Sequence, residues 1–242
     1  MTKKTIGELL YGVHSAIEVL KAKRRKVISI YTTKPEPKGW QEIKKYWPVY
    51  HVAVQYVARD VLTRMAGTTD HQGIVAWVEA YPLRKKMFDV KKTPFLLLLD
   101  GIQDPRNVGA IIRSAYCAGV QGIMMTQKHS SPLNATAVKA SAGLAEHIEI
   151  MVIPSAIWAA QELQKAGYAI YLAAFGGENA LTCSYTMPLC LVVGSEGSGI
   201  SKALYAYGKQ VTIPQKSHDI SYNVSVAAGI LLVTIATKID AV

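Results

Sequence analysis

Three short polar stretches of the sequence combine residue types that bind ligands or take part in chemistry, and each directly follows an apolar run. The first spans residues 100–113 and reads DGIQDPRNVGAIIR. If Asn107 caps a helix, Asn107, Gly109 and Arg113 gather near its N-terminus, which favours anions through its free N–H groups. An ordinary helix cap with a solvated arginine explains the same residues.

The second stretch has three glycines in six positions, Gly194, Gly197 and Gly199. Such a loop offers bare backbone amides to a ligand. It is not a P-loop, because no Gly-Lys-Ser/Thr follows, and neither a dinucleotide-binding spacing nor a nucleophile elbow is present. Ser195 adds a hydroxyl, while Glu196 would repel a phosphate but favour a cation. A flexible turn is the alternative.

The third stretch begins at Ile213 and Pro214 and ends in the polar residues that precede the last predicted helix. Ser221 or Asn223 is predicted to cap that helix, so these side chains would lie at its N-terminus. A cap alone would explain them. His218 titrates near neutral pH, although a lone histidine here is more often a loop residue than a general base.

The region after Pro94 alternates between buried strands and helices. Phe95–Leu99 is continuously apolar, which indicates a strand buried on both faces of a sheet. The pattern predicts a largely parallel α/β sheet, whose ligand crevice lies at the carboxyl ends of the strands. The other predicted strands are Gly122–Thr126, Ile148–Val152, Ala169–Ala173, Leu189–Val193 and Gln210–Ile213. The predicted N-caps are Asn107, Asn134, Ser155 and Ser201, and the predicted residues after helix ends are Gly119, Gly143 and Gly167.

The first 80 residues predict a separate, small α/β domain. Short β-branched runs indicate strands at Val27–Tyr31, Val49–Val54 and Gly73–Val78. Amphipathic stretches between them indicate helices, one of which ends at Gly67. Residues 81–94 lose periodicity, are dense in charge and are bracketed by prolines. They predict a linker between a domain of residues 1–80 and a domain of residues 95–242.

The composition bounds the class of protein. An apolar fraction of 50% supplies a core, and the net charge of +10 attracts polyanions such as nucleic acid. The three cysteines form no C-x-x-C pair, which predicts buried free thiols and no metal site. The uncharged run Val224–Thr237 is too short for a membrane span and predicts a buried helix. We expect a cytoplasmic protein without a membrane partner, since the first residues do not read as an export signal.

Taken jointly, the three stretches resemble the three motifs of the SpoU (TrmH-type) branch of the SPOUT methyltransferases. The matching residues are Asn107-x-Gly109-x-x-x-Arg113, Gly194-Ser195-Glu196-Gly197-x-Gly199, and Ile213-Pro214 with Ser221-x-Asn223. Residues 11–16 (YGVHSA) and 71–76 (HQGIVA) are similar to the substrate-binding domain of the bacterial 23S ribosomal RNA guanosine-2′-O-methyltransferases. The resemblance covers nearly the full length of the chain.

The resemblance implies a fold, a cofactor and an assembly. It implies a C-terminal α/β domain with a deep trefoil knot, a small N-terminal α/β domain that is similar to ribosomal proteins and binds RNA, and a homodimer. The implied cofactor is S-adenosylmethionine, held by the knot loops at Gly194, Ser195, Gly197, Gly199, Ile213, Pro214 and Tyr222. Tyr222 departs from the family, which usually has leucine between the serine and the asparagine.

The implied reaction transfers the sulfonium methyl group to a ribose 2′-hydroxyl of RNA. The implied catalytic residues are Arg113, Asn107, Glu196, Ser221 and Asn223. A guanidinium is a poor base, because its pKa exceeds about 12, so Arg113 is expected to fix a phosphate beside the reacting ribose. The basic run Lys21–Lys26 and the linker lysines are expected to contact phosphates in a salt-dependent way, with plain solvated surface as the alternative.

The favoured substrate is a guanosine of 23S ribosomal RNA, because the N-terminal half is similar to that of the ribosomal enzymes. A transfer-RNA ribose methyltransferase of the same superfamily is the nearest alternative. A non-catalytic RNA-binding protein of the same fold is another, although the joint presence of all five implied catalytic residues argues against it. A nucleotide-dependent enzyme built on the glycine loop lacks the lysine and the metal-binding partners that it would need.

Overall fold

The computed structural model describes residues 7–217 and 220–239. The chain forms two compact units. The first consists of Met1–Pro82 and Leu133–His147, and the second of Leu83–Pro132 and Ile148–Val242. The first unit therefore includes a segment from the middle of the chain, which no periodicity in the sequence indicates.

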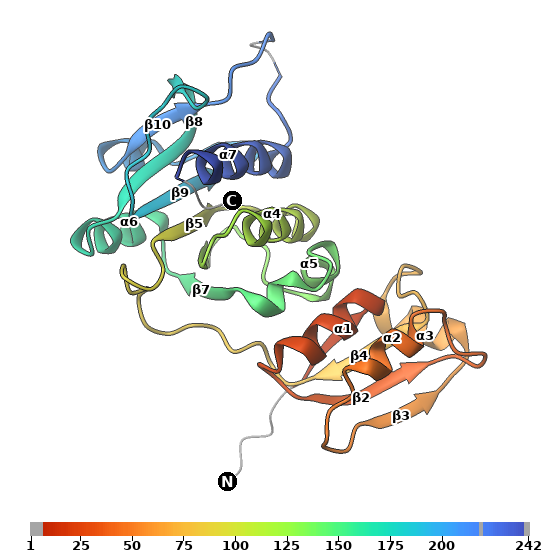
Figure 1. Ribbon diagram of the computed structural model, residues 1–242. Coiled ribbons are helices and arrows are strands. Elements are labelled where there is room, and N and C mark those ends of the chain that lie inside the picture. Colours follow the sequence, from red (N-terminus) through yellow and green to blue (C-terminus); the bar gives the residue numbers. More distant parts are fainter. Residues whose placement is uncertain (1–6, 218–219, 240–242) are drawn as a thin grey trace. The chain divides into compact units, whose positions relative to one another are not determined.

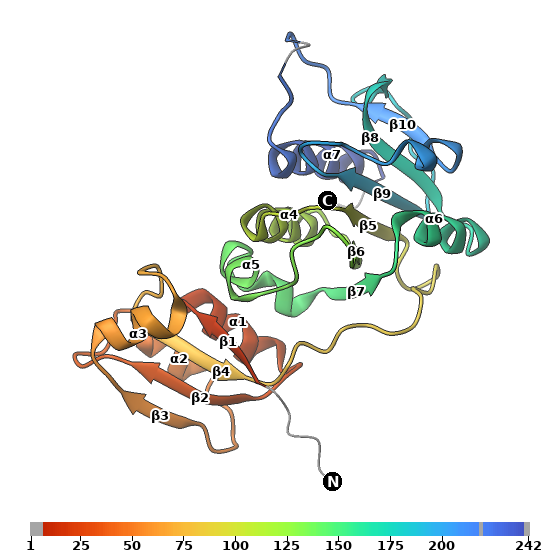
Figure 2. The same cartoon turned by 180° about the vertical axis from the view of Figure 1, so that it is seen from behind.

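The second unit is built on a six-stranded sheet in which all neighbouring strands are parallel. Its strand order is β10-β8-β9-β5-β6-β7, which can be followed from two sides in Figures 1 and 2. Strands β5 to β10 span Phe95–Asp100, Gly122–Thr126, Glu149–Ile153, Ala169–Asn179, Leu189–Gly194 and Lys209–Thr212. The predicted parallel sheet is confirmed, and apart from the end of β8 each predicted strand end lies within one residue of the observed one.

Strand β8 is longer than predicted and is interrupted where it pairs with β10. Gln210 pairs with Leu172, but the next residue, Val211, pairs with Glu178. Residues 173–177 therefore form an excursion between two paired segments of β8. A Cβ at Gly177 would lie 2.5 Å from the backbone carbon of Gln210, so only glycine allows β8 to return this closely to β10.

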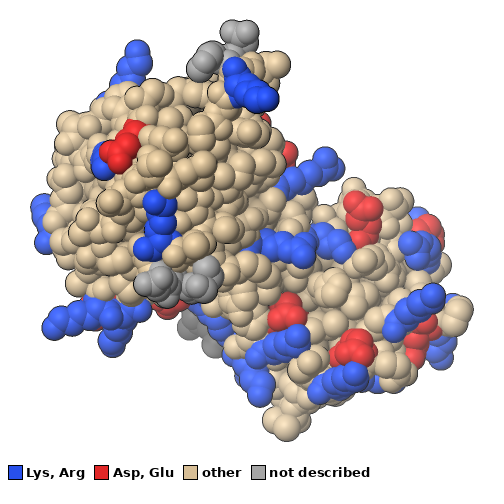
Figure 3. Space-filling model, turned by 45° about the horizontal axis from the view of Figure 1, so that its top comes forward, with Lys and Arg blue, Asp and Glu red and all other residues tan. Residues whose placement is uncertain are grey.

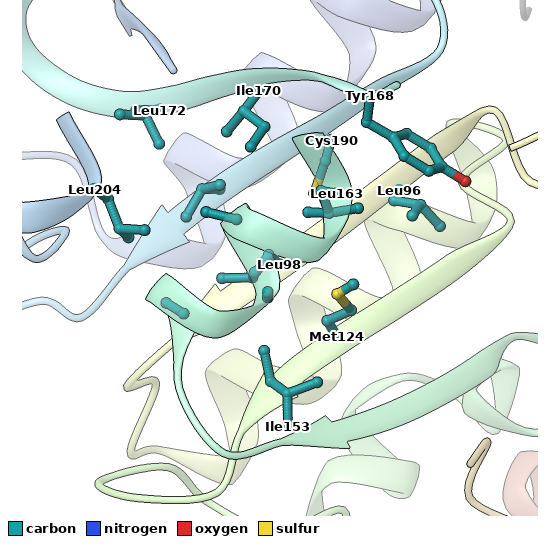
Figure 4. Close-up of a cluster of buried hydrophobic side chains, with 14 of the residues drawn as sticks. Leu96, Leu98, Met124, Ile153, Leu163, Tyr168, Ile170, Leu172, Cys190 and Leu204 are labelled. Atoms are coloured by element: carbon teal, nitrogen blue, oxygen red, sulfur yellow. The ribbon is translucent and has the colours of Figure 1, made fainter. Parts of the chain in front are cut away.

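The core of the second unit depends on the central strand β5, whose residues 95–99 are all buried. Successive side chains alternate between the two faces of the sheet. Figure 4 shows Leu96 and Leu98 in a buried cluster with Met124, Ile153, Leu163, Tyr168, Ile170, Leu172, Cys190 and Leu204. This cluster includes side chains of helix α6 (Ala156–Lys165), so α6 covers this face of the sheet.

Helices α4 (Pro105–Cys117) and α7 (Val224–Lys238) pack against each other, and α7 also contacts β9. Helix α7 was predicted to be buried, and this is only partly right. Val226 and Val233 are 49% and 57% exposed in this chain, because one stripe of α7 faces away from the unit. A short 3₁₀-helix, η2 (Lys202–Ala206), follows the second polar stretch.

The helix ends correct one prediction that bears on function. Asp104, not Asn107, caps α4, because its side chain accepts a hydrogen bond from the Arg106 N–H and Pro105 takes the first helical position. Asn107 therefore lies in the first turn of α4. Asn223 caps α7 by accepting from the Ser225 N–H, and Ser221 does not.

Asn134 and Ser155 are confirmed as N-caps of α5 (Ala135–Ala140) and α6. Ser201 precedes η2 without a capping hydrogen bond from its side chain. Two of the predicted glycines, Gly119 and Gly167, directly follow the C-cap residues of α4 and α6 and adopt a positive φ. The third prediction is off by one residue, because Ala142 occupies the position expected for Gly143 and adopts a positive φ of 55°.

The first unit contains a four-stranded sheet of order β1-β4-β2-β3 with three helices along the same stretch of chain. Its strands span Glu8–Tyr11, Val27–Thr32, Ala53–Tyr56 and Ile74–Val78, and its helices α1 to α3 span Val13–Ala22, Trp40–Lys45 and Arg59–Ala66. Strand β1 was not predicted, and it pairs antiparallel with β4. The strand predicted at 49–54 is displaced to Ala53–Tyr56, where it pairs in parallel with β2.

The mid-chain segment of the first unit comprises α5 and the 3₁₀-helix η1 (Leu144–His147). Its Glu146 is fully buried and binds Arg25, whose side chain is 1% exposed, through both carboxylate oxygens. Arg25 also binds Glu8, at 2.5 Å. Arg25 is thus an internal ion-pair partner, and its expected role among the phosphate-binding residues 21–26 is corrected.

The cysteines of the chain are free. Cys183 and Cys190 are buried, as predicted, but Cys117 at the end of α4 is exposed. Within residues 7–217 and 220–239, no group of three or more His, Cys, Asp or Glu side chains is arranged to hold a metal ion. Among the same residues, no helix is both long enough and apolar enough to cross a membrane.

Replacing Glu146 by alanine should destabilise the first unit strongly. Arg25 would remain buried with only Glu8 as a carboxylate partner, so we expect the free energy of unfolding to fall by about 3 kcal/mol. Urea denaturation followed by circular dichroism measures this loss. Glu162→Ala, which removes the surface pair Glu162–Lys165, should cost less than about 1 kcal/mol. Equal losses in the two variants would contradict the expectation.

Candidate active site

Side chains from the three polar stretches meet at one carboxylate oxygen. The Asn107 amide donates a hydrogen bond of 2.6 Å to Oε1 of Glu196. The Asn223 amide donates to the same Oε1 at 2.9 Å, and also to Oδ1 of Asn107 at 3.3 Å. Each of the three side chains thus contacts the other two, although they lie up to 116 positions apart in the sequence.

Each member of this network has a position set by its own element. Asn107 lies in the first turn of α4, because Asp104 and Pro105 begin that helix. Glu196 lies in a loop after β9 that is closed by an antiparallel bridge between Ser195 and Gly199. Asn223 caps α7 with its Oδ1, which leaves its Nδ2 free to donate to Glu196. An amide can perform both tasks, because it carries an acceptor and two donors.

The parallel sheet brings these loops together. Strands β5 and β9 are neighbours, and Asp100 at the end of β5 pairs with Gly194 at the end of β9. Because both strands run in the same direction, the loops that follow them leave the sheet at the same edge. A Cβ at Gly194 would lie 2.2 Å from the backbone carbon of Gly199, so glycine is required for the loop to fold back here.

A cavity of about 360 Å³ lies at this edge of the sheet. Most of its wall is apolar side chains and the backbone of the glycine loop. Six of the seven predicted cofactor-binding residues line it, namely Gly194, Ser195, Gly197, Gly199, Ile213 and Tyr222. The seventh, Pro214, is exposed and is not part of the wall. Glu196 and Ser221 also line this cavity.

The excursion of β8 contributes residues to the same cavity that the sequence had not singled out. Ala173, Ala174 and Phe175 line its wall, and Phe175 is 64% exposed. The sequence pattern predicted a ligand crevice at the carboxyl ends of the strands, and these residues lie where the predicted strand 169–173 ends. The break in pairing with β10, which turns these residues out of the ladder, has no local sequence signal.

A second cavity, of about 430 Å³, shares the loop 195–198 with the first. Its other lining residues are Gly101, Ile102, Gln103, Asp104 and Asn107, all from the loop after β5 and the first turn of α4. Glu196 therefore lines both cavities, and its carboxylate is held by the two amides beside them. The second cavity was not predicted from the sequence.

Arg113 and Asn223 line neither cavity. Arg113 is exposed on α4, and no hydrogen bond or ion pair engages its side chain within the described part of the chain. Of the five predicted catalytic residues, Asn107, Glu196 and Asn223 are hydrogen-bonded to one another. Ser221 lines the first cavity, whereas Arg113 neither lines a cavity nor joins this network. His218 lies outside the residues that the structure describes.

Asp100 is a further residue at the site that was not singled out from the sequence. It ends β5, directly beneath the start of the glycine loop. Burial raises the pKa of its carboxyl group above the ordinary value, while a hydrogen bond with the backbone of Ser201 acts in the opposite direction. Asp100 therefore ties the end of β5 to the segment that leaves the glycine loop.

A parallel α/β sheet with a glycine loop, a capped helix and two adjoining cavities at its carboxyl edge is the arrangement of an enzyme that binds a nucleotide-like ligand. Residues 94–233 match the SpoU rRNA Methylase family, and residues 9–84 match the family described as RNA 2′-O ribose methyltransferase substrate binding. The chain belongs to the SpoU rRNA methylase family. The predicted family and enzyme class, an RNA 2′-O-methyltransferase, are confirmed.

Two curated relatives are similar over nearly their whole length. The chain is 33% identical over 236 residues to the 23S rRNA (guanosine-2′-O-)-methyltransferase RlmB of Vibrio parahaemolyticus, covering 93% of this chain and 95% of that protein. It is 31% identical over 243 residues to RlmB of Haemophilus influenzae, covering 96% and 98%.

Solved structures share the fold. An RNA 2′-O ribose methyltransferase superposes with a TM-score of 0.84 at 18% identity, covering 97% of this chain and 89% of that one. The SpoU methyltransferase AviRb of Streptomyces viridochromogenes, in complex with the cofactor AdoMet, superposes with a TM-score of 0.77 at 21% identity, covering 98% and 92%. The predicted fold class, a methyltransferase α/β domain with a small N-terminal α/β domain, is confirmed.

Asn223→Asp should separate the two tasks of the Asn223 side chain. Aspartate caps helices about as well as asparagine, but it has no amide to donate and adds a charge beside Glu196. We expect the first turn of α7 to keep its protection from hydrogen exchange, while the loop 195–199 exchanges about tenfold faster or more, since a hydrogen bond to a charged group is lost.

Hydrogen exchange followed by mass spectrometry measures both segments in the same sample. Asn223→Ala removes the cap as well, so it should expose both segments and lower the free energy of unfolding by about 1 kcal/mol. If the loop 195–199 exchanged at the wild-type rate in the aspartate variant, the network would not be what holds it.

Proposed function

We propose that this protein transfers the methyl group of S-adenosylmethionine to the 2′-hydroxyl of a guanosine in 23S ribosomal RNA. The observation that carries the proposal is the meeting of Asn107, Glu196 and Asn223 between two cavities of ligand size. The curated relatives, named as 23S rRNA guanosine-2′-O-methyltransferases, support the choice of RNA and nucleotide over a transfer RNA.

The first cavity suits S-adenosylmethionine. Its volume of about 360 Å³ falls in the range of small-molecule sites. Apolar side chains such as Ile200, Val224 and Leu231 suit the face of an adenine ring, and the backbone groups of residues 194–199 and 212–213 suit its polar edge. When bound, the cofactor supplies an electrophilic methyl group on a sulfonium. Tyr222, in place of the usual leucine, adds an aromatic ring to this wall.

The side chains around the network position the acceptor nucleotide. Glu196 is held by two amides, so its carboxylate cannot swing away, and a fixed negative charge favours a neighbouring cationic sulfonium. Asn107 faces the second cavity and Ser221 the first. Arg113 binds a phosphate next to the reacting ribose, because its guanidinium is permanently charged, exposed and without a protein partner within the described residues.

RNA binding extends over the first unit. Lys23 and Lys26 are exposed, whereas Lys21 is paired with Glu18 and Arg25 is buried. On the face shown in Figure 3, lysine and arginine side chains are interspersed with acidic ones over the first unit, so phosphate contacts are spread out and salt-dependent. The linker lysines, among them Lys85 and Lys86, are exposed and are expected to make further phosphate contacts.

The proposal includes the other expectations from the resemblance. The proposed domains are residues 1–80 and 95–242 with a linker at 81–94, which the family matches at 9–84 and 94–233 support, although residues 133–147 pack in the first compact unit. These expectations also include the trefoil knot, and the segments after β9 and β10, where the resemblance places the knot loops, line one cavity. The reaction needs no metal, and ribosomal RNA as substrate puts the enzyme in the cytoplasm.

The proposed homodimer is supported by the exposed stripe of α7. A helix that is apolar on all sides is normally buried on all sides, yet Val226 and Val233 are 49% and 57% exposed. Tyr116 on the neighbouring α4 is 42% exposed. A second copy of the chain that covers α4 and α7 would bury these side chains, and would bring its own residues close to the exposed Arg113.

Mapping 2′-O-methyl groups in ribosomal RNA tests the proposed function. Cells without the protein should lack one 2′-O-methylguanosine of 23S RNA, and the wild-type gene should restore it. Arg113→Ala should not, because loss of phosphate positioning lowers kcat/KM for methyl transfer by about 100-fold or more. Calorimetry should find cofactor binding retained in this variant. Lys165→Ala serves as the charge-matched control, because Lys165 lies on α6 and lines neither cavity.

Val233→Lys should convert the dimer into a monomer. A lysine at the centre of the exposed stripe would have to lose its hydration on association, which costs several kcal/mol. Light scattering after size exclusion measures the mass. Val152→Lys places the same charge on another exposed valine, on β7, and should leave the mass unchanged. A wild-type mass in the Val233 variant would count against this interface.

A further inference from the structure

The second cavity is acidic. Asp104 and Glu196 line it, and no lysine or arginine is among the described residues of its wall. Two carboxylates repel an anion, so this cavity does not suit a phosphate of the RNA backbone. At about 430 Å³ it has the volume of a small-molecule site and lies next to the first cavity across the loop 195–198.

The charged groups of this cavity are two carboxylates, each with an oxygen that no hydrogen bond engages within the described chain. Glu196 and Asn107 are engaged with each other and with Asn223. Asp104 uses Oδ1 to accept from the Arg106 N–H at 2.8 Å, and its Oδ2 has no hydrogen-bond partner within the described chain. An ionised carboxylate is only an acceptor. A ligand group that pairs with these free carboxylate oxygens must therefore be a hydrogen-bond donor.

Guanine is the RNA base that presents the most donors on its Watson–Crick edge, namely N1–H and the N2 amino group. Proteins read unpaired RNA bases by hydrogen bonds to that edge. We propose that the second cavity holds the base of the target guanosine, and that Oδ2 of Asp104 accepts a hydrogen bond from its N2 amino group. Asp104 is then the residue that selects guanine. This inference rests on the proposed function.

Asp104→Asn separates the proposed recognition of guanine by the Asp104 carboxylate from its role as the N-cap of α4. Asparagine caps helices about as well as aspartate, so Arg106 keeps its partner and α4 keeps its start. The variant removes the charge and can turn a donor toward the N2 amino group. Asp89→Asn is the matched control, because Asp89 is also exposed and its Oδ1 accepts from a backbone N–H two residues on, that of Lys91. Asp89 lines neither cavity.

The probe is a synthetic RNA that carries either guanosine or inosine at the mapped position, since inosine differs from guanosine only by lacking the N2 amino group. For the wild type, kcat/KM should be about tenfold or more higher with guanosine than with inosine. Asp104→Asn should reduce this preference to about twofold or less, and Asp89→Asn should retain it. Fluorescence anisotropy should show the same preference in the affinities for the two RNAs.

Two results would overturn the inference. One is a guanosine preference in Asp104→Asn that equals that of the wild type. The other is a loss of S-adenosylmethionine affinity by calorimetry with an unchanged preference, which would assign the acidic cavity to the cationic part of the cofactor. Failure of the proposed function looks different: the wild type then methylates neither RNA, and the anisotropy preference alone decides whether Asp104 reads guanine.

Discussion

Two amides donate to one carboxylate oxygen, that of Glu196, and the geometry of the whole site depends on this contact. Asn107 lies in the first turn of α4, Asn223 lies at the start of α7, and Glu196 lies in the loop after β9. The two amides also contact each other, so displacing any one of the three segments breaks two hydrogen bonds. The network therefore holds the wall between two cavities in place, and with it the relative position of the ligands that these cavities suit.

The contact is possible because two strands that are distant in sequence are neighbours in the sheet. Asp100 pairs with Gly194 across the parallel strands β5 and β9, so the loops after them start side by side. A glycine at 194 lets the second loop fold tightly back on itself. Asp100 is partly buried next to this loop, and burial raises the pKa of its carboxyl group because it disfavours the charged form. A hydrogen bond with the backbone of Ser201 partly offsets this effect.

The sequence predicted the parallel sheet well, because strands buried on both faces read as continuous apolar runs. It missed β1 and displaced β3, because these four-residue strands form by pairing with β4 and β2, which is not a local property. It placed the start of α4 at Asn107, because two good caps stand three residues apart and only Asp104 is followed by proline. The second and third motifs identified the glycine-loop part of the first cavity, but not the wall formed by residues 173–175. The second cavity could not be predicted from the sequence, because its wall combines Gln103 and Asp104 with the loop 195–198, which is distant in sequence.

The two N-terminal motifs have a physical role that their resemblance to a substrate-binding domain does not explain. In the first unit, Oε1 of Gln72 accepts from the Val13 N–H at 3.2 Å and from Nζ of Lys139 at 2.5 Å. The Tyr11 hydroxyl contacts Thr136 at 3.3 Å, so both motifs reach helix α5. Residues 133–147 fall inside the stretch that matches the methylase family, yet they pack within the first unit and bury Glu146 there against Arg25. A buried charge pair tolerates loss of one partner poorly. These motifs therefore hold part of the sequence that matches the methylase family within the first compact unit.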